Sequence, residues 1–168
     1  MKKMKRLAAV LLVGIMALAM LTACGGTPST PVTRDEALEK SVAEWTVELG
    51  KGAKLELTQD ATLTSISDKC LPAVFKIYDA KDEDAAKAAE EELKTAFIAA
   101  TNGKKVAPVE VYIQGTKVTK DVLAQAVQQN MSNIQTTLER LGVKNPTKFG
   151  VTVTKQKDYT LILFMVSE

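Results

Sequence analysis

The stretch that most constrains the fold is a run of eight residues near the C-terminus, Tyr159 to Val166, with the sequence Tyr-Thr-Leu-Ile-Leu-Phe-Met-Val. Side chains of a β-strand point alternately to the two faces of a sheet. This run is apolar at both sets of alternating positions, a pattern typical of a strand that is buried on both faces. We therefore expect a central strand, with helices covering both faces of its sheet.

Two further segments have strand patterns. Residues 149–154 alternate apolar with small or polar side chains, and residues 155–158 are expected to turn the chain into the final strand as a hairpin. Val109 to Gln114 also alternates and predicts a strand with one wet face. Together these segments predict a small antiparallel sheet.

A helix is expected to begin at Thr33, because Thr33 and Glu36 have the spacing of a capping box. An apolar stripe predicts that it runs as far as Gly50 and Gly52. The stripe consists of Leu38, Val42, Trp45 and Leu49. We expect Trp45 to pack in the core, with ligand stacking as the alternative.

The middle of the chain predicts two more helices. Asp60 can cap a helix that Pro72 is expected to end, and residues 73–78 then have the composition of a strand. The next helix is predicted from about Asp82 to Thr101, with Gly103 after it.

The most regular pattern in the chain predicts one long helix capped by Thr119 and closed by Gly142 and Pro146. Its apolar face consists of Leu123, Val127, Met131, Ile134, Leu138 and Leu141. The predicted fold is therefore a single α+β domain over residues 33–168, an α-β-α sandwich with the C-terminal strand in the centre of the sheet.

The N-terminus has the pattern of an export signal: a cationic start, then an uncharged apolar run from Leu7 to Leu21. A permanent transmembrane anchor is the alternative. The run is about fifteen residues, however, whereas a spanning helix needs about twenty. Gly25 and Pro28 would also end a helix here.

The signal closes with Leu21-Thr22-Ala23-Cys24, which resembles the lipobox of bacterial lipoproteins. The resemblance implies a signal peptide over residues 1–23, cleavage after Ala23 and a diacylglyceryl group on the thiol of Cys24. Residues 24–32 would then form a flexible tether about 25 Å long at most. The mature protein is expected outside the cytoplasm, on the outer face of the cell membrane, with that membrane as a partner through its lipid.

Removal of the signal changes the charge. The precursor has 22 basic and 20 acidic residues, but four of the basic residues lie in the signal, so the mature chain has 18 and 20. Nucleic-acid binding thus loses its compositional support. The chain has no histidine, which excludes Ser-His and Cys-His catalysis and most zinc sites. We expect no cofactor and no metal, and a buried Cys70, with a reactive thiol as the alternative.

The order of elements resembles the CAP (SCP-like) superfamily, whose α-β-α sandwich has a small antiparallel sheet. The similar segments are Leu55–Leu63, Gln114–Val127, Phe149–Val153 and Tyr159–Val166. The chain departs from the family at its cavity, which two histidines and two acids mark, and Met131–Asn133 does not match the expected Gly-His-Arg. No metal-linked activity is therefore carried over, and an unrelated α+β domain is the alternative.

Three functions follow as hypotheses. The first is a non-catalytic module that binds a partner protein, a peptide or a small apolar ligand. Its possible binding face is the polar side of the long helix: Gln128, Gln129, Asn133 and Thr136. The second is an accessory subunit of an envelope complex or transporter. The third is a histidine-free hydrolase that uses Ser-Lys chemistry or paired acids, and the nearest Ser-Lys candidates are Thr64, Ser65, Ser67 and Lys69.

Overall fold

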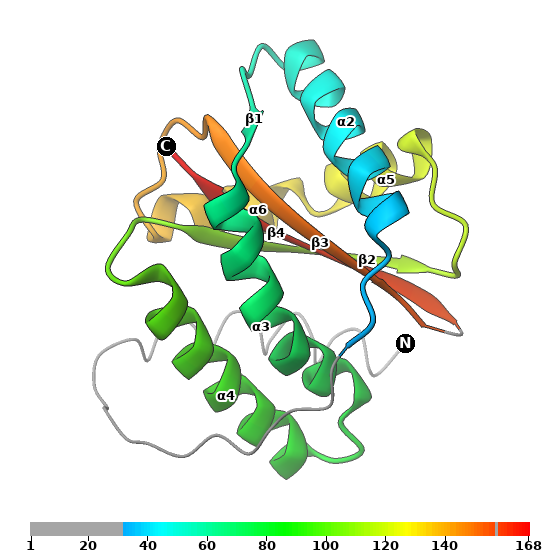
Figure 1. Cartoon of the computed structure of the whole chain (residues 1–168), viewed down its shortest axis with the longest axis vertical. Helices are drawn as coiled ribbons and strands as arrows, with labels where there is room; N and C mark the ends of the chain where they lie inside the picture. Colours follow the sequence, from blue (N-terminus) through cyan, green and yellow to red (C-terminus); the bar gives the residue numbers. More distant parts are fainter. Residues whose placement is uncertain (1–31, 157) are drawn as a thin grey trace.

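The computed structural model describes residues 32–156 and 158–168, and in this part of the chain a four-stranded sheet lies between helices (Figure 1). The strands are arranged in the order β1-β3-β4-β2. Helices pack on both faces of the sheet and form two separate apolar cores with it. The α+β fold and the helical cover on both faces are therefore confirmed.

The C-terminal strand β4 (Tyr159–Ser167) is central, as predicted. It pairs antiparallel with β3 (Lys148–Lys155) on one side and with β2 (Ala107–Gln114) on the other. Both faces of β4 are buried from Thr160 to Met165. Burial on both faces is what the unbroken apolar run requires, because neither set of alternating side chains can face water favourably.

The sheet is mixed, so the expectation of a purely antiparallel sheet is wrong. The short strand β1 (Thr58–Gln59) runs parallel to β3. Two backbone hydrogen bonds hold it there: the amide of Thr58 donates to the carbonyl of Thr147 at 2.8 Å, and the amide of Asp60 donates to Phe149 at 2.7 Å. A strand of two residues with exposed side chains has no alternating pattern, so this pairing could not be predicted from the sequence.

One face of the sheet packs against α2 (Glu36–Gly52), α5 (Lys120–Gln129) and α6 (Met131–Arg140). The strands contribute alternate side chains to this core, among them Val151 and Ile162. The opposite face packs against α3 (Ala61–Asp79), with α4 (Glu83–Thr101) outside it. Leu161, Leu163 and Met165 of β4 lie in this second core.

The N-cap of helix α2 lies two residues later than predicted. Its N-cap is Asp35, whose carboxylate accepts the amide of Leu38 at 2.9 Å, so the capping box of Thr33 and Glu36 is wrong. The carbonyl of Thr33 instead accepts the hydroxyl of Thr154 at the end of β3. The backbone before the helix is thus held by the sheet. The expected caps at Asp60 and Thr119 are present, and Asp82, where the next helix is predicted to begin, is the N-cap of α4.

Helix α3 continues through Pro72, so the predicted helix end and the strand over residues 73–78 are wrong. A proline inside a helix costs about 3 kcal/mol. The residues beside it, including Leu71 and Val74, are buried in the core with α4 and the sheet. Each such side chain contributes about 1.5–3 kcal/mol when buried. Packing of both sides of Pro72 therefore outweighs the lost backbone hydrogen bond.

The long helix predicted after Thr119 is two helices, α5 and α6, which are separated at Asn130. The backbone of Asn130 is not helical (ψ 4°), and its side-chain amide donates to the carbonyl of Ala126 at 2.8 Å. This bond caps α5, and asparagine favours such local hydrogen bonds over helix continuation. The apolar period survives the break, which is why the pattern alone predicts one helix.

The lipobox residues Leu21, Thr22, Ala23 and Cys24, the signal peptide and most of the tether lie outside the described residues. Within residues 32–156 and 158–168, no helix combines the length and the apolar character that a membrane span requires.

Candidate binding pocket

The main candidate site is an apolar pocket between the ends of α2, the pair α5 and α6, and the sheet. It encloses about 320 Å³ and is open to solvent. Ligand pockets in proteins are mostly apolar and start at about 300 Å³. The pocket is lined by Leu49, Leu123, Val127, Met131, Ile134 and Leu138 from the helices, and by Val109, Phe149, Phe164 and Val166 from the strands.

Gly50 allows the wall of the pocket that contains Leu55 and Leu57 to form. A Cβ atom at Gly50 would lie 3.0 Å from Cδ1 of Leu57 and 3.2 Å from the carbonyl oxygen of Leu55. The segment after α2 therefore folds back closely against the helix end, where the amide of Leu55 donates to the carbonyl of Gly50 at 2.8 Å. This return places Leu55 and Leu57 in the pocket wall.

No charged side chain lines the pocket, and Thr46 and Gln128 are its two polar ones. The Thr46 hydroxyl already donates to the carbonyl of Val42 at 2.7 Å within α2. Gln128 is exposed. An ion pair between Lys120 and Glu48 joins α5 to α2 without lining the pocket. The interior of the pocket thus offers apolar contacts, and the side-chain amide of Gln128 lies at its edge.

The four residues of the predicted polar face are divided by the break at Asn130. Gln128 and Gln129 lie on α5, whereas Asn133 and Thr136 lie on α6, and all four are exposed. Only Gln128 lines the pocket. The hydroxyl of Thr136 donates to the backbone carbonyl of Ser132 at 2.9 Å.

The sequence reasoning missed the pocket because its residues have the pattern of a core. The apolar stripe of α5 and α6 faces the sheet as predicted, but part of it borders the hollow instead of closing it. Met131 is 50% exposed and Leu55 is 40% exposed. Their apolar character together with this exposure marks the rim. Apolar period alone cannot distinguish such a rim from a filled core.

The residues proposed for Ser-Lys chemistry do not come together. Ser67 is buried, with its hydroxyl 2.7 Å from that of Thr152 and 2.8 Å from the carbonyl oxygen of Leu163. Lys69 and Ser65 are exposed, and Thr64 donates its hydroxyl to the carbonyl of Asp60. Ser67 therefore fastens α3 to the sheet.

Cys70 is fully buried, as expected from the sequence. Burial raises the pKa of its thiol to about 12. A thiol in this setting stays protonated near neutral pH, and the thiolate is the reactive form. The alternative of a reactive Cys70 is thus disfavoured.

All three tyrosines of the chain gather on the other face of the sheet. Tyr78 of α3 stacks on Tyr112 of β2 with ring centroids 5.5 Å apart, and Tyr159 of β4 lies 5.2 Å from Tyr112. The Tyr78 hydroxyl donates to Glu110 at 3.3 Å. Burial raises the pKa of the Glu110 carboxyl to about 7 and that of Tyr159 to about 12. The cluster packs on itself, so we assign it to the fold rather than to a ligand site.

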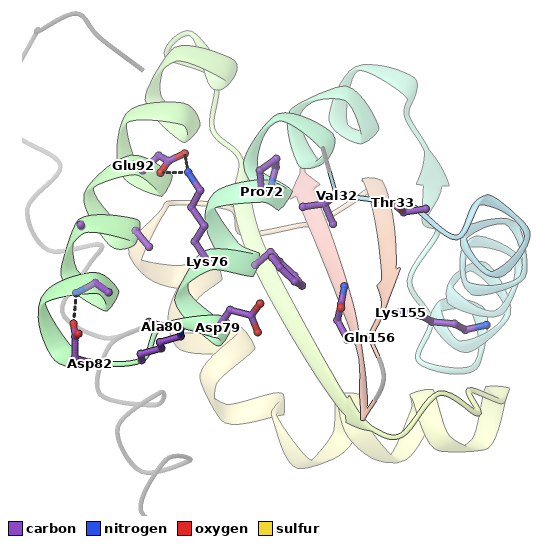
Figure 2. A pocket seen from close by; sticks show the side chains of 15 residues that line it. Val32, Thr33, Pro72, Lys76, Asp79, Ala80, Asp82, Glu92, Lys155 and Gln156 are labelled. Carbon is purple, nitrogen blue, oxygen red and sulfur yellow. Dashed lines mark hydrogen bonds and ion pairs between the residues drawn. The ribbon is translucent and has the colours of Figure 1, made fainter. Parts of the chain in front are cut away.

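A second hollow lies between α3 and α4, close to where the described chain begins. It is open, has a volume of about 830 Å³ and is bordered by Val32 and Thr33. Figure 2 shows Lys76 reaching from α3 to Glu92 on α4, and both carboxylate oxygens of Glu92 lie 2.7 Å from its Nζ. The wall carries charges of both signs, among which Lys76 pairs with Glu92, so no single charge in it selects a ligand.

The chain matches no family model, no curated protein and no solved structure. Its resemblances to bacterial lipoproteins and to the CAP superfamily therefore stay predictions. Within the described residues, no group of three or more acidic or cysteine side chains is placed to hold a metal ion.

Proposed function

We propose that this protein is a lipid-anchored lipoprotein of the outer face of the cell membrane, which binds a small apolar ligand without catalysing a reaction. The observation that carries the binding function is the uncharged pocket of about 320 Å³ between α2, α5, α6 and the sheet. The lipobox at Leu21–Cys24 supports the anchoring.

The pocket is open to solvent, so its apolar lining, which includes the exposed side chains of Leu55 and Met131, is in contact with water. Covering apolar surface with an apolar molecule is favourable. Exposed apolar surface gathered in a groove is typical of ligand-binding sites. The pocket thus fits a binding protein better than a passive spacer.

Binding can be tested with the uncharged fluorescent probe N-phenyl-1-naphthylamine. We expect its fluorescence to rise with the mature protein, and the rise to be lost in Ala124→Leu, which puts a larger side chain into the pocket wall. Ala99→Leu is the matched control, because Ala99 is exposed on α4 and far from this lining. Equal binding by both variants, each with an unchanged melting temperature, would show that the pocket is not the site.

The accessory-subunit hypothesis predicts a different result. In a membrane pulldown, a stable stoichiometric protein partner that Ala124→Leu still captures, with no probe bound by the isolated protein, would favour that role over ligand binding.

The anchor has its own test. Wild-type protein should partition into detergent with the membrane fraction and carry the mass of a diacylglyceryl group on Cys24. Cys24→Ser should lack that mass and remain an uncleaved precursor. Anchoring is refuted if the variant equals the wild type in mass and in membrane association.

A further inference from the structure

We infer that the ligand of the pocket is a free amphiphile with a single hydrocarbon chain and an uncharged, hydrogen-bonding head group. This inference rests on the proposed function and concerns the same pocket.

The charge of the walls argues for a neutral ligand. All lining side chains are uncharged, and the nearby cation of Lys120 is already paired with Glu48. A carboxylate or ammonium group at this surface would lose water without gaining a partner of opposite charge. Fatty acids and alkylamines should therefore bind more weakly than an alcohol of the same chain length.

The walls also indicate which part of the ligand lies inside. Aliphatic side chains of α5 and α6 form one side, and Phe149 and Phe164 of the sheet form the base. Met131 at the rim is flexible and adapts to irregular shapes. Such a lining makes apolar contacts along a chain and provides no interior hydrogen bond, because the Thr46 hydroxyl is bonded within its own helix.

The edge of the pocket supplies the polar contact. Gln128 lines it and is exposed, and its side chain carries a carbonyl acceptor and an amide donor. A hydroxyl or amide head group can pair with either. The neighbouring Gln129 is also exposed but does not line the pocket.

The position of the pocket favours a ligand from the aqueous phase over a lipid of the anchoring bilayer. The described chain begins at Val32, which packs on the α3–α4 side of the sheet. The pocket lies on the opposite face, beside the start of β3 at Phe149, whereas Asp35 is hydrogen-bonded to Val153 near the end of that strand. The start of the described chain at Val32 and the pocket thus lie at opposite ends of the domain.

The test is displacement of N-phenyl-1-naphthylamine from the mature protein by three ten-carbon compounds: decan-1-ol, decanoate and decylammonium. We expect half-displacement by decan-1-ol at a concentration about tenfold lower than by either ion, a ratio equal to about 1.4 kcal/mol. Equal or stronger displacement by decanoate or decylammonium would overturn the inference while leaving the pocket as the site, since probe binding lost in Ala124→Leu tests the pocket separately. Absence of probe binding in every variant would overturn both proposals.

Two further measurements address the head group and the source. Gln128→Ala should raise severalfold the concentration of decan-1-ol that displaces half of the probe, without changing the affinity of the probe. Gln129→Ala should change neither the displacing concentration nor the probe affinity. No effect of Gln128→Ala on decan-1-ol would refute the assigned polar contact. After incubation with phosphatidylcholine vesicles, native mass spectrometry should show no phospholipid on the protein. A one-to-one phospholipid adduct would refute the aqueous source.

Discussion

Among the carboxyl groups of the described residues, Glu110 is the one whose acid–base behaviour the fold changes most. Its carboxyl group lies between β2 and α3, half-buried, and accepts a hydrogen bond from Tyr78. Loss of solvent raises its pKa to about 7, against an ordinary value of 4.5. The folded protein therefore holds a proton on Glu110 at mildly acidic pH, where the unfolded chain has already released it.

This difference predicts that Glu110 weakens the fold as the pH rises. Below about pH 4.5 the Glu110 carboxyl is protonated in both the folded and the unfolded protein. Between pH 4.5 and 7 the folded protein binds more protons than the unfolded chain, so the free energy of unfolding falls as the pH rises. Glu110→Gln should therefore be more stable than wild type at pH 8, by about 1–2 kcal/mol, and equal to it near pH 4. The full shift would give about 3 kcal/mol, but the residual exposure of the group reduces it.

Urea unfolding at pH 4, 6 and 8 measures this effect. The comparison between the two variants isolates Glu110 from carboxyl groups such as Asp35 and Asp60, whose lowered pKa values act in the opposite direction. A constant difference between the variants at all three pH values would contradict the prediction.

Gly150 allows β3 and α3 to approach each other closely. A Cβ atom at this position in β3 would lie 2.0 Å from the backbone nitrogen of Thr64 and 2.1 Å from the carbonyl carbon of Leu63. Because these are backbone atoms, α3 as a whole would have to move. Gly150→Ala should thus lower the free energy of unfolding by about 3 kcal/mol or more.

The control for Gly150→Ala is Gly52→Ala. Gly52 is the last residue of α2, and a Cβ there meets nothing within 4 Å. Alanine at this position should stabilise the protein by about 0.5–1 kcal/mol. Thermal melts of both variants check the pair, and a mild effect of Gly150→Ala would mean that α3 can shift away from the sheet.

At the scale of elements, α3 contains an energetic conflict that one substitution can relieve. Pro72 removes the backbone hydrogen bond to Asp68 and lies at the wall of the open hollow between α3 and α4, where it is only partly buried (Figure 2). Pro72→Ala should therefore raise the free energy of unfolding by about 1–3 kcal/mol.

Pro146→Ala is the matched control, because Pro146 lies in the loop between α6 and β3 and restricts the unfolded chain without breaking a helix. It should be neutral or slightly destabilising, by up to about 1 kcal/mol. Chemical denaturation measures both. If Pro72→Ala were destabilising, the ring of Pro72 would contribute packing that exceeds its cost to the helix.

The elements that could be predicted from the sequence are those in which local preference and packing agree. The unbroken apolar run of β4, the acidic start of α4 near Asp82 and the cap of α3 at Asp60 each lead to one structure. The failures occur where the two disagree. Pro72 favours a break that the buried side chains around it override, and Asn130 introduces a break that the continuous apolar stripe hides.

The candidate site could be predicted only in part. Gln128 was placed on a possible binding face by its polarity, and it does border the pocket. Leu123, Val127 and Ile134 were assigned to the core, because a residue beside a hollow and one beside a filled interior have the same apolar character. Whether α5 and α6 close against the sheet depends on the angle between these two helices and on how closely the segment after α2 folds back at Gly50. Neither can be predicted from the apolar pattern.

At the scale of the whole molecule, the pocket and the start of the described chain are held apart by rigid structure. Helix α2 extends from Glu36, close to Val32, to Gly52 beside the pocket, which is about 25 Å along its axis. If the protein is lipid-anchored as proposed, a short tether should keep the α3–α4 end near the bilayer and the pocket farther from it.

This orientation can be measured with single fluorophores on lipidated protein in vesicles that contain brominated lipids. Lys81→Cys lies in the hollow near Val32, and Gln128→Cys lies at the pocket. The buried thiol of Cys70 should escape labelling. We expect stronger quenching at position 81 than at position 128. The reverse order would contradict the orientation, and the chain without residues 1–24, which lacks both the signal and the lipid, should show no quenching at either position.

The contacts of Arg34 have a mechanical consequence for an anchored protein. Its guanidinium is held by Glu39 of α2 at 2.8 Å and by Asp68 of α3 at 3.3 Å, and the same Glu39 accepts the amide of Val153 in β3 at 2.9 Å. The neighbouring backbone is bonded to β3 at Thr33 and Asp35. In the proposed lipoprotein, a force that pulls on the anchor would therefore reach α2, α3 and β3 together rather than one helix alone.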